Sequence, residues 1–534
     1  MRGPSPSPSS ARVSCATARA TRPSLGLAVA TAALPAVLVL TVVAAFTRFL
    51  GVGFVGTDSL TLVETSRVGS WSDVGALFAQ PVMAGTTFAQ GEVVYRPFVS
   101  LTFAVEHAVW GLDPLGYHAT NLALHGLTTL AVWALLRGLH LSRPASLIGG
   151  LLFGLHPLVV ATVPVLARRD SLVPVAAFTG AMALLCHGAT GGGRRWPWTI
   201  GSLLLYGIAL LSKESAFAAL LLVPAVLACV GVAGGLGTPP ARVALVRRVI
   251  PYGVLTVVVF ALRFAVLGSL GGYRGTSIAT LDTSAYRAVV TGFARFLLWP
   301  VGELFPRGST AWAALLAVVL LALTAASSAM PTRPGSVVRV GCLWIAVFAV
   351  FYTVVKTLSG AWLAYFPLVG LALIAAGVVQ ALPSAIRALD SGDPPGVRLW
   401  RGGAPLFVAA GLALFSLATL RSSPLMEAYP EWDAAHAITA RYLAAAVECA
   451  RSEPDLTVLT LTNVPNLLDY PDRASDLLAP TLVSDNTVQA ALDAFLPSRS
   501  VAVVAESYGT VLWSAEPLRL SCSGAGAGRR LAAE

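Results

Sequence analysis

The sequence predicts an all-α polytopic membrane protein with about eleven transmembrane helices and a small α/β domain at its C-terminal end. Three observations predict this fold class. Apolar residues make up 56% of the chain and charged residues only 12%, which is about half the charge of an average soluble domain. Apolar runs recur along residues 25–420. The arginines are concentrated in every second loop between these runs, as the positive-inside rule requires.

The N-terminal part of the chain predicts a leader and a first membrane span. Residues 1–24 are rich in Ser, Pro and Arg and contain no acidic residue, which is typical of a disordered cytoplasmic leader. The apolar run 25–49 has no small-residue cleavage site at a typical distance, so we expect an uncleaved signal anchor. The more polar segment 50–117 is expected to form an outer loop with short surface helices.

Ten further apolar runs predict the rest of the transmembrane domain, 25–420. They lie at 118–136, 145–166, 171–188, 198–212, 215–233, 250–268, 310–330, 338–355, 362–382 and 404–420. With a cytoplasmic leader, every inner loop carries at least two arginines, for example Arg137 and Arg143, and the short outer loops carry few. With a cytoplasmic N-terminus, an odd number of spans places the C-terminal tail on the extracytoplasmic side of the membrane. Because the chain contains many arginines and few lysines, we expect it to lie in the plasma membrane of a bacterium.

The tail, 421–534, predicts a small extracytoplasmic α/β domain. Acids outnumber arginines 14 to 8, and a helical stretch at 431–449 precedes strand-like stretches at 457–465 and 500–507. Cys449 and Cys522 could form a disulfide in an oxidising compartment, and two unpaired cysteines are the alternative. The net charge of +10 does not indicate nucleic-acid binding, because the arginines are scattered between apolar runs. The six cysteines show no metal-ligand spacing.

Polar residues are concentrated in the stretch 95–125, between two long apolar runs. Pro97 suits the first turn of a helix, which the GLDP sequence then ends. On the next helix His118, Asn121 and His125 are spaced i, i+3, i+7 and share one face. Polar groups at the mouth of a membrane helix are candidates for a functional site. Interfacial anchoring and interhelical hydrogen bonds are the alternative interpretation.

Two outer loops each place a cation beside an acid. Arg169 precedes Asp170, and Lys213 precedes Glu214. Interfacial snorkelling would explain such pairs. In the predicted topology, however, they lie on the same side of the membrane as Asp58, Arg96 and His118, so we expect a ring of charge around an outer cavity. A carboxylate among cations at the edge of a low-dielectric region suits both a base and an anion-binding site.

The order of these motifs resembles a known family. After an acidic position that follows the first span come YRP (95–97), WGLDPLGYHATNLALH (110–125), GLHPL (154–158), RRD (168–170), LLSKES (210–215) and YFPLVGLAL (365–373). Over roughly 50–380 the chain resembles the GT-C superfamily of integral-membrane glycosyltransferases. Within it, the sequence is most similar to bacterial relatives of the transmembrane and tetratricopeptide-repeat O-mannosyltransferases, without the repeats.

The resemblance implies an inverting transfer of a sugar, with mannose as the candidate, from a polyprenyl-phosphate donor to an acceptor hydroxyl on the outer face of the membrane. Family members use an acid in the first outer loop as general base, and Asp58 stands in that position. The expected ligands of the donor phosphate are Arg96, His118, Arg169 and Lys213, and the expected supporting residues are Asp170, Glu214, Asn121, His125 and Tyr95. No cofactor is expected, and no motif indicates a divalent metal, although some members of the superfamily use one.

The expected partners are the sugar donor, a protein, glycan or lipid acceptor, and membrane lipid. The chain departs from the family pattern at three places. Ser59 stands where many members have a second acid, and Ala361 and Trp362 stand where they have an acid–arginine pair. After GLHPL the sequence continues as VVATVPVLA to residue 167, without the acid that members usually have there. Whether the loss of the second acid at Ser59 abolishes activity is left open by the sequence. A catalytically silent scaffold for envelope assembly and a transporter of a lipid-linked sugar are therefore the alternative functions.

Overall fold

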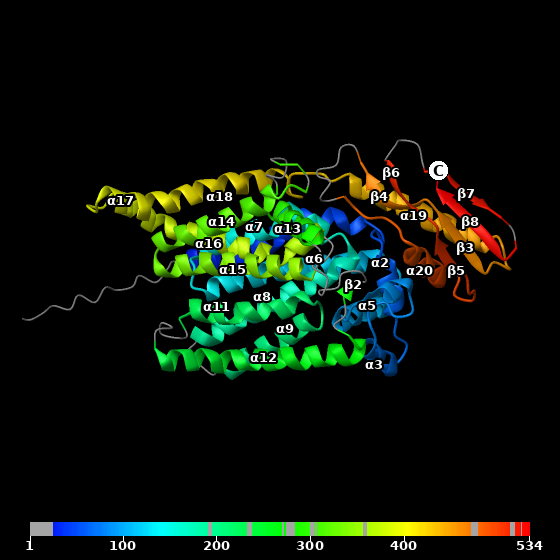
Figure 1. Cartoon of the computed structure of the whole chain (residues 1–534), viewed down its shortest axis with the longest axis horizontal. Helices are drawn as coiled ribbons and strands as arrows, with labels where there is room; N and C mark the ends of the chain where they lie inside the picture. The colour runs from blue at the N-terminus through cyan, green and yellow to red at the C-terminus, as the bar shows by residue number, and fades with distance from the viewer. Residues whose placement is uncertain are drawn as a thin grey trace, which may run out of the picture.

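The computed structural model describes residues 25–190, 195–231, 238–269, 272–273, 283–299, 305–306, 308–355, 360–470, 479–512, 518–524 and 526–533. The predicted leader, 1–24, lies outside the described residues. The described chain is mostly helical, and its strands gather near the C-terminal end, which confirms the predicted fold class. In Figure 1 the helical bundle lies on one side and the strands lie beyond one of its ends.

Eight helices of the described chain are long and apolar enough to cross a membrane, so the protein is a multi-pass membrane protein. They are α1 (Leu25–Phe46), α6 (Pro114–Gly138), α8 (Arg169–Thr190), α12 (Pro239–Leu267), α14 (Ala311–Ala326), α15 (Thr332–Val354), α16 (Leu368–Leu389) and α18 (Ala404–Arg421). The short helices beside them include η5 (Ser327–Ala329), α13 (Thr283–Leu297), α17 (Pro395–Arg398) and the π-helical η7 (Leu399–Gly403).

Three of the eleven predicted spans form shorter helices. They are α7 (Arg143–Gly154), α9 (Trp196–Leu210), and α10 (Ser215–Ala218) continued by η4 (Ala219–Leu221) and α11 (Leu222–Cys229). Helix α7 ends because Pro157 follows closely and starts the short η2 (Pro157–Ala161), which η3 (Leu166–Arg168) follows. The run 145–166 therefore overestimated the length of α7, whereas the run 198–212 matches the length of α9.

Helix α16 lies at the centre of the bundle. Of its membrane span, 83% is buried inside the protein, against 11% for the span of α18, which faces outward. Helices α15 and α16 approach closely at Gly341 and Gly370. A Cβ atom on Gly341 would lie 2.6 Å from the carbonyl oxygen of Gly370, so only glycine permits this contact.

The predicted outer loop folds into short elements at one end of the bundle (Figure 1). They are η1 (Thr47–Gly51), α2 (Ser59–Thr65), α3 (Trp71–Ala79), α4 (Thr87–Gly91), β1 (Glu92–Val93) and α5 (Pro97–Trp110). Strand β1 pairs antiparallel with β2 (Gly272–Tyr273). Pro97 occupies the first turn of α5, as predicted. Helix α5 ends at Gly111, whose φ of 57° lies in the left-handed region that favours glycine.

The C-terminal part of the chain forms an α/β domain at the same end of the bundle (Figure 1). Its elements are α19 (Glu431–Arg451), β3 (Val458–Thr462), β4 (Val464–Asp469), α20 (Asp485–Phe495), β5 (Ala502–Ala505), β6 (Tyr508–Leu512), β7 (Leu520–Ser523) and β8 (Gly528–Ala533). One sheet has the order β5-β3-β8-β7, and β4 pairs with β6. Cys449 and Cys522 form a disulfide across 73 residues, which settles the alternative that the sequence left open.

Candidate active site

A cavity of about 360 Å³ lies where the C-terminal domain meets the loop after α1 and the ends of the membrane helices. Its volume falls within the range of about 300–1,000 Å³ that is usual for small-molecule sites. The bundle side contributes a "charged wall", defined by Asp58, Arg96, Arg168 and Asp170. The C-terminal domain contributes a "neutral wall", defined by Asn466, Thr481, Ser484, Asn486 and Tyr508. Apolar and aromatic side chains, including Phe88 and Trp362, complete the lining.

Asp58 projects its carboxylate from the start of α2. It occupies the N-cap position, where an aspartate usually accepts a hydrogen bond from the first turn, but here its side chain makes no capping bond. The preceding backbone is held by the C-terminal domain, because the hydroxyls of Ser484 and Thr487 both donate to the carbonyl oxygen of Thr57. The carboxylate is thus fixed in place without being used for helix capping.

Burial raises the pKa of the Asp58 carboxyl above its usual range. Arg168 and Arg96 lower this pKa and Asp170 raises it further, but burial is the dominant cause and the net direction is upward. A carboxylate with a raised pKa holds a proton more strongly and is therefore a better general base.

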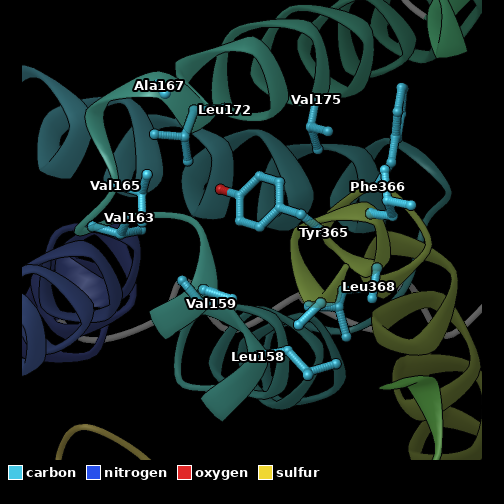
Figure 2. Close-up of a cluster of buried hydrophobic side chains, with 14 of the residues drawn as sticks. Leu158, Val159, Val163, Val165, Ala167, Leu172, Val175, Tyr365, Phe366 and Leu368 are labelled. Atoms are coloured by element: carbon cyan, nitrogen blue, oxygen red, sulfur yellow. The ribbon is translucent and has the colours of Figure 1, made fainter. Parts of the chain in front are cut away.

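Arg168 is the cation of the charged wall that sequence reasoning missed. Its guanidinium carbon lies 3.7 Å from the ring centroid of Trp362. Within the described chain it makes no ion pair and no hydrogen bond, so its N–H groups are available to a ligand. The backbone that carries it is fixed in the core, since Val163, Val165 and Ala167 are buried in one cluster with Tyr365 (Figure 2).

The remaining charges of the wall form an ion-pair network. Arg96 donates to Asp170 at 2.7 Å and to Glu214 at 3.1 Å. Lys213 pairs with Asp170 at 3.0 Å and donates to Ser171 at 2.7 Å. The structure thus brings together the YRP, RRD and SKE motifs, which are far apart in the sequence. Their charges fix one another in place around the cavity.

Helix α12 contributes a fifth partner that the sequence did not indicate. Arg263 pairs with Glu214 at 2.9 Å and is buried. Among the described residues of the cavity and its network, four cations (Arg96, Arg168, Lys213, Arg263) face three carboxylates (Asp58, Asp170, Glu214). When Asp58 is ionised, this count leaves one positive charge in excess, which favours an anionic ligand.

Arg169, expected to bind the donor phosphate, lies away from the cavity. Its side chain is fully buried, and its guanidinium forms an ion pair with Glu106. It also donates to Asn121 at 2.9 Å and to the carbonyl oxygen of Tyr117 at 3.1 Å. The expectation is corrected on this point, because the donors of Arg169 are satisfied inside the protein and do not reach the cavity.

His118, also expected to bind phosphate, is likewise buried and does not line the cavity. Its Nε2 lies 3.1 Å from the carbonyl oxygen of Gly53, and its side chain is 2% exposed. The face shared by His118, Asn121 and His125 is therefore a buried one. His125 lies 2.9 Å from the hydroxyl of Tyr365, and Asn121 donates to two backbone carbonyls. The structure favours the alternative that these residues make interhelical hydrogen bonds.

Tyr95, expected as a supporting residue, and Ser59, at the position of the missing second acid, also have structural contacts. Tyr95 donates its hydroxyl to the carbonyl oxygen of Phe78 at 2.8 Å and is not part of the cavity lining. Ser59, which stands at the expected second acid, is fully buried and donates to the carbonyl oxygen of Val55 at 2.8 Å. The side chain at position 59 points into the protein, so the cavity's only lining carboxylates among the described residues are Asp58 and Asp170.

In the described part of the chain, no group of three His, Cys, Asp or Glu side chains is placed to hold a metal ion. The chemistry that can be assigned here is that of one partly buried carboxylate and two arginines around a cavity. The carboxylate can accept a proton, and the guanidinium groups can bind a phosphate through charge-assisted hydrogen bonds.

Comparison with known proteins supports the resemblance found in the sequence. No protein-family profile matches the chain. The chain is 35% identical over 128 residues to the protein O-mannosyl-transferase Tmtc1 of Drosophila melanogaster, which covers 24% of this chain and 15% of that protein. It is 34% identical over 133 residues to the human protein O-mannosyl-transferase TMTC2, covering 22% of this chain and 15% of that protein. The matched part thus spans about 15% of the length of these relatives.

Two solved structures are similar to the chain at low sequence identity. One is the archaeal oligosaccharyltransferase AglB from Archaeoglobus fulgidus in complex with an inhibitory peptide and a dolichol-phosphate, with a TM-score of 0.45, 11% identity, and coverage of 82% of this chain and 63% of that chain. The other is ArnT from Cupriavidus metallidurans bound to undecaprenyl phosphate, with a TM-score of 0.42, 15% identity and coverage of 90% of both chains.

Proposed function

We propose that this protein is a glycosyltransferase that moves a sugar from a polyprenyl-phosphate donor to an acceptor hydroxyl, on the side of the membrane where the C-terminal domain lies. The proposal gains support from the sequence likeness to protein O-mannosyl-transferases, which makes mannose the first sugar to test. The same proposal holds that this side is extracytoplasmic and that the membrane is the plasma membrane of a bacterium.

The observation that carries the proposal is the position of Asp58. It is a carboxylate on the cavity wall with a pKa raised by burial, it is free of capping bonds, and it lies in the electrostatic field of Arg168. In the proposed reaction Asp58 takes the proton of the acceptor hydroxyl as the oxygen attacks the anomeric carbon. The new bond joins this oxygen to the anomeric carbon, and the bond from that carbon to the phosphate oxygen breaks with inversion.

The leaving group is the polyprenyl phosphate, which departs with the bonding electrons and an additional negative charge. Arg168 is placed to bind it, because its guanidinium is stacked on Trp362 and its donors make no bond in the described chain. Arg96 contributes a second positive charge on the same wall. Lys213 and Glu214 hold Arg96 and Asp170 in position and do not line the cavity. Charge neutralisation by two arginines stabilises the leaving group without requiring a metal.

The experiment is transfer by the purified full chain in detergent from a panel of radiolabelled polyprenyl-phosphate sugars. We expect one donor to give a glycosidic product and Asp58→Asn to abolish it, while Asp390→Asn, an exposed carboxylate outside the cavity, leaves it unchanged. Product formation at the wild-type rate in Asp58→Asn would falsify the base assignment.

The same assay distinguishes the alternative functions. A silent scaffold gives no product with any donor and acceptor, whereas a transporter moves the labelled lipid across proteoliposome membranes without forming a glycosidic bond. Either result would overturn the proposed transfer.

A further inference from the structure

The two walls of the cavity differ in chemistry. Among the described residues, all charged side chains of the lining come from the bundle side, and every polar residue of the neutral wall carries an amide or a hydroxyl. The neutral wall comes from three elements of the C-terminal domain: β4, the start of α20 with the residues before it, and β6. Asp485 is the nearest carboxylate in sequence, but it accepts from Tyr508 and Thr87 and does not line the cavity.

Part of the neutral wall is used to hold the domain together. Ser484 donates to Thr57, Tyr508 donates to Asp485, and the amide nitrogen of Asn466 donates to the carbonyl oxygen of Val483 at 3.0 Å. These bonds fix the wall as a rigid surface.

Three polar atoms of the neutral wall make no hydrogen bond within the described chain. They are the hydroxyl of Thr481, the amide nitrogen of Asn486 and the amide oxygen of Asn466. A Cβ atom placed on Gly56 would lie 3.9 Å from the Thr481 hydroxyl, so this hydroxyl lies beside the backbone two residues before Asp58. A hydroxyl, a donor and an acceptor without a hydrogen-bond partner in the described chain thus line the same cavity as the carboxylate proposed as the base.

This set of groups suits one class of acceptor. Amides and hydroxyls can donate to and accept from sugar hydroxyls, and the aromatic rings of Phe88 and Trp362 provide flat apolar surfaces in the same cavity. The described residues of the neutral wall carry no charge that could pair with an ionised group, and burying an unpaired charge against them would be costly.

We propose that the C-terminal domain forms the acceptor subsite and that this subsite selects an uncharged saccharide, whose attacking hydroxyl it directs toward Asp58. This inference rests on the proposed transferase function. It assigns Thr481, Asn486 and Asn466 to acceptor recognition, and it divides the cavity into a donor-phosphate half and an acceptor half.

The test uses the purified full chain with the donor found active in the panel and two acceptor probes. The probes are a set of neutral p-nitrophenyl glycosides and an N-acetylated, C-amidated peptide with one Ser and one Thr. We expect a glycoside to be glycosylated. In Thr481→Val combined with Asn486→Ala, its KM should rise about tenfold, because two hydrogen bonds to the acceptor are lost. The KM for the donor should stay unchanged.

The matched control is Thr457→Val, since the Thr457 hydroxyl also lies in the C-terminal domain but donates to the carbonyl oxygen of Ala527, away from the cavity. It should leave both KM values unchanged. An equal rise in donor KM in the double variant would overturn the division into two halves. Transfer to the peptide in preference to every glycoside would overturn the saccharide class.

A binding measurement separates this inference from the transferase proposal. If no donor gives a product, the transferase proposal fails, and the glycosides are then tested for protection of the full chain against thermal unfolding. Protection by a glycoside that is lost in the double variant and kept in Thr457→Val supports a saccharide subsite on its own. Equal or absent protection in all three proteins rejects it.

Discussion

Arg168 and Arg169 are neighbours in the chain but belong to two different regions of the molecule. Arg168 ends η3 at the cavity, where its guanidinium lies on Trp362 without another partner in the described chain. Arg169 begins α8 and is fully buried, where Glu106, Asn121 and the backbone of Tyr117 satisfy its donors. Of these two neighbours, only Arg168 keeps guanidinium donors that are not used by the described part of the protein.

The two regions therefore have different energetic roles. The charges around Arg169 hold α5, α6 and α8 together, since Glu106 comes from α5 and Asn121 from α6. The charged wall places the guanidinium of Arg168 at the cavity, without an ion-pair partner in the described chain. We expect substitutions in the first region to reduce stability and substitutions in the second region to reduce the rate of transfer.

The largest effect is expected for Arg169→Ala. This change leaves the buried carboxylate of Glu106 without its cation, and removing one partner of a buried pair costs about 3–5 kcal/mol. Thermal unfolding in detergent should shift to a clearly lower temperature. Replacing both partners, Arg169→Met with Glu106→Leu, should restore part of the loss because no unpaired charge remains. Wild-type unfolding of Arg169→Ala together with lost transfer would instead place Arg169 at the substrate.

Arg168→Ala should lower the rate of transfer but leave the stability of the protein unchanged. The transfer rate should fall about 10²- to 10³-fold, the usual effect of removing one group that stabilises developing charge. The unfolding temperature should stay near that of the wild type, since the guanidinium makes no ion pair in the described chain. Arg168→Lys should retain part of the rate, and Arg387→Ala, an exposed arginine outside the cavity, serves as the control. A full rate in Arg168→Ala would remove this residue from the site.

The sequence predicted the fold class and the gathering of three motifs because both depend on strong local signals. Apolar runs indicate membrane helices, the RRD and SKE motifs stand at the ends of two such runs, and YRP begins the polar stretch 95–125. The structure accordingly joins Arg96, Asp170 and Lys213 in one network. Helical spacing also placed His118, Asn121 and His125 on one face, but spacing carries no information on depth, and that face is buried.

Other parts of the site depend on contacts that no local pattern encodes. Which of Arg168 and Arg169 reaches the cavity is decided by the backbone at the junction of η3 and α8. Arg263 meets Glu214 only through the packing of α12. The neutral wall comes from residues about 400 positions after Asp58, and its docking on Thr57 is a tertiary contact. Prediction of these features requires the packed structure.

The pH dependence of Asp58 links the charged wall to stability. Because burial raises its pKa in the folded protein above the model value of 3.8, transfer should fall on acidification at a higher pH than an ordinary aspartate would give. Ionised Asp58 costs the folded state stability at pH values above its raised pKa, and this cost is absent below pH 3.8. Asp58→Asn should therefore unfold at a higher temperature than the wild type at pH 7, with the difference vanishing near pH 3.8. A lower unfolding temperature of Asp58→Asn at pH 7 would contradict the raised pKa.

The smallest effect is expected where the neutral wall holds the base. Ser484→Ala with Thr487→Val removes both hydroxyls that donate to the carbonyl oxygen of Thr57, so the loop carrying Asp58 is held less firmly. Each bond contributes about 0.5–1.5 kcal/mol, so kcat should fall about tenfold with the donor KM unchanged. Thr462→Val, which removes a hydroxyl bonded to Glu506 away from the cavity, should leave kcat unchanged. The same two hydroxyls also form the capping box of α20. If their bonds to Thr57 position the base, the acid limb of the pH profile should also shift in the double variant, since the surroundings of the Asp58 carboxyl change with its position. A fall in kcat without any change in that limb would mean that the two hydroxyls stabilise the domain and do not position the base.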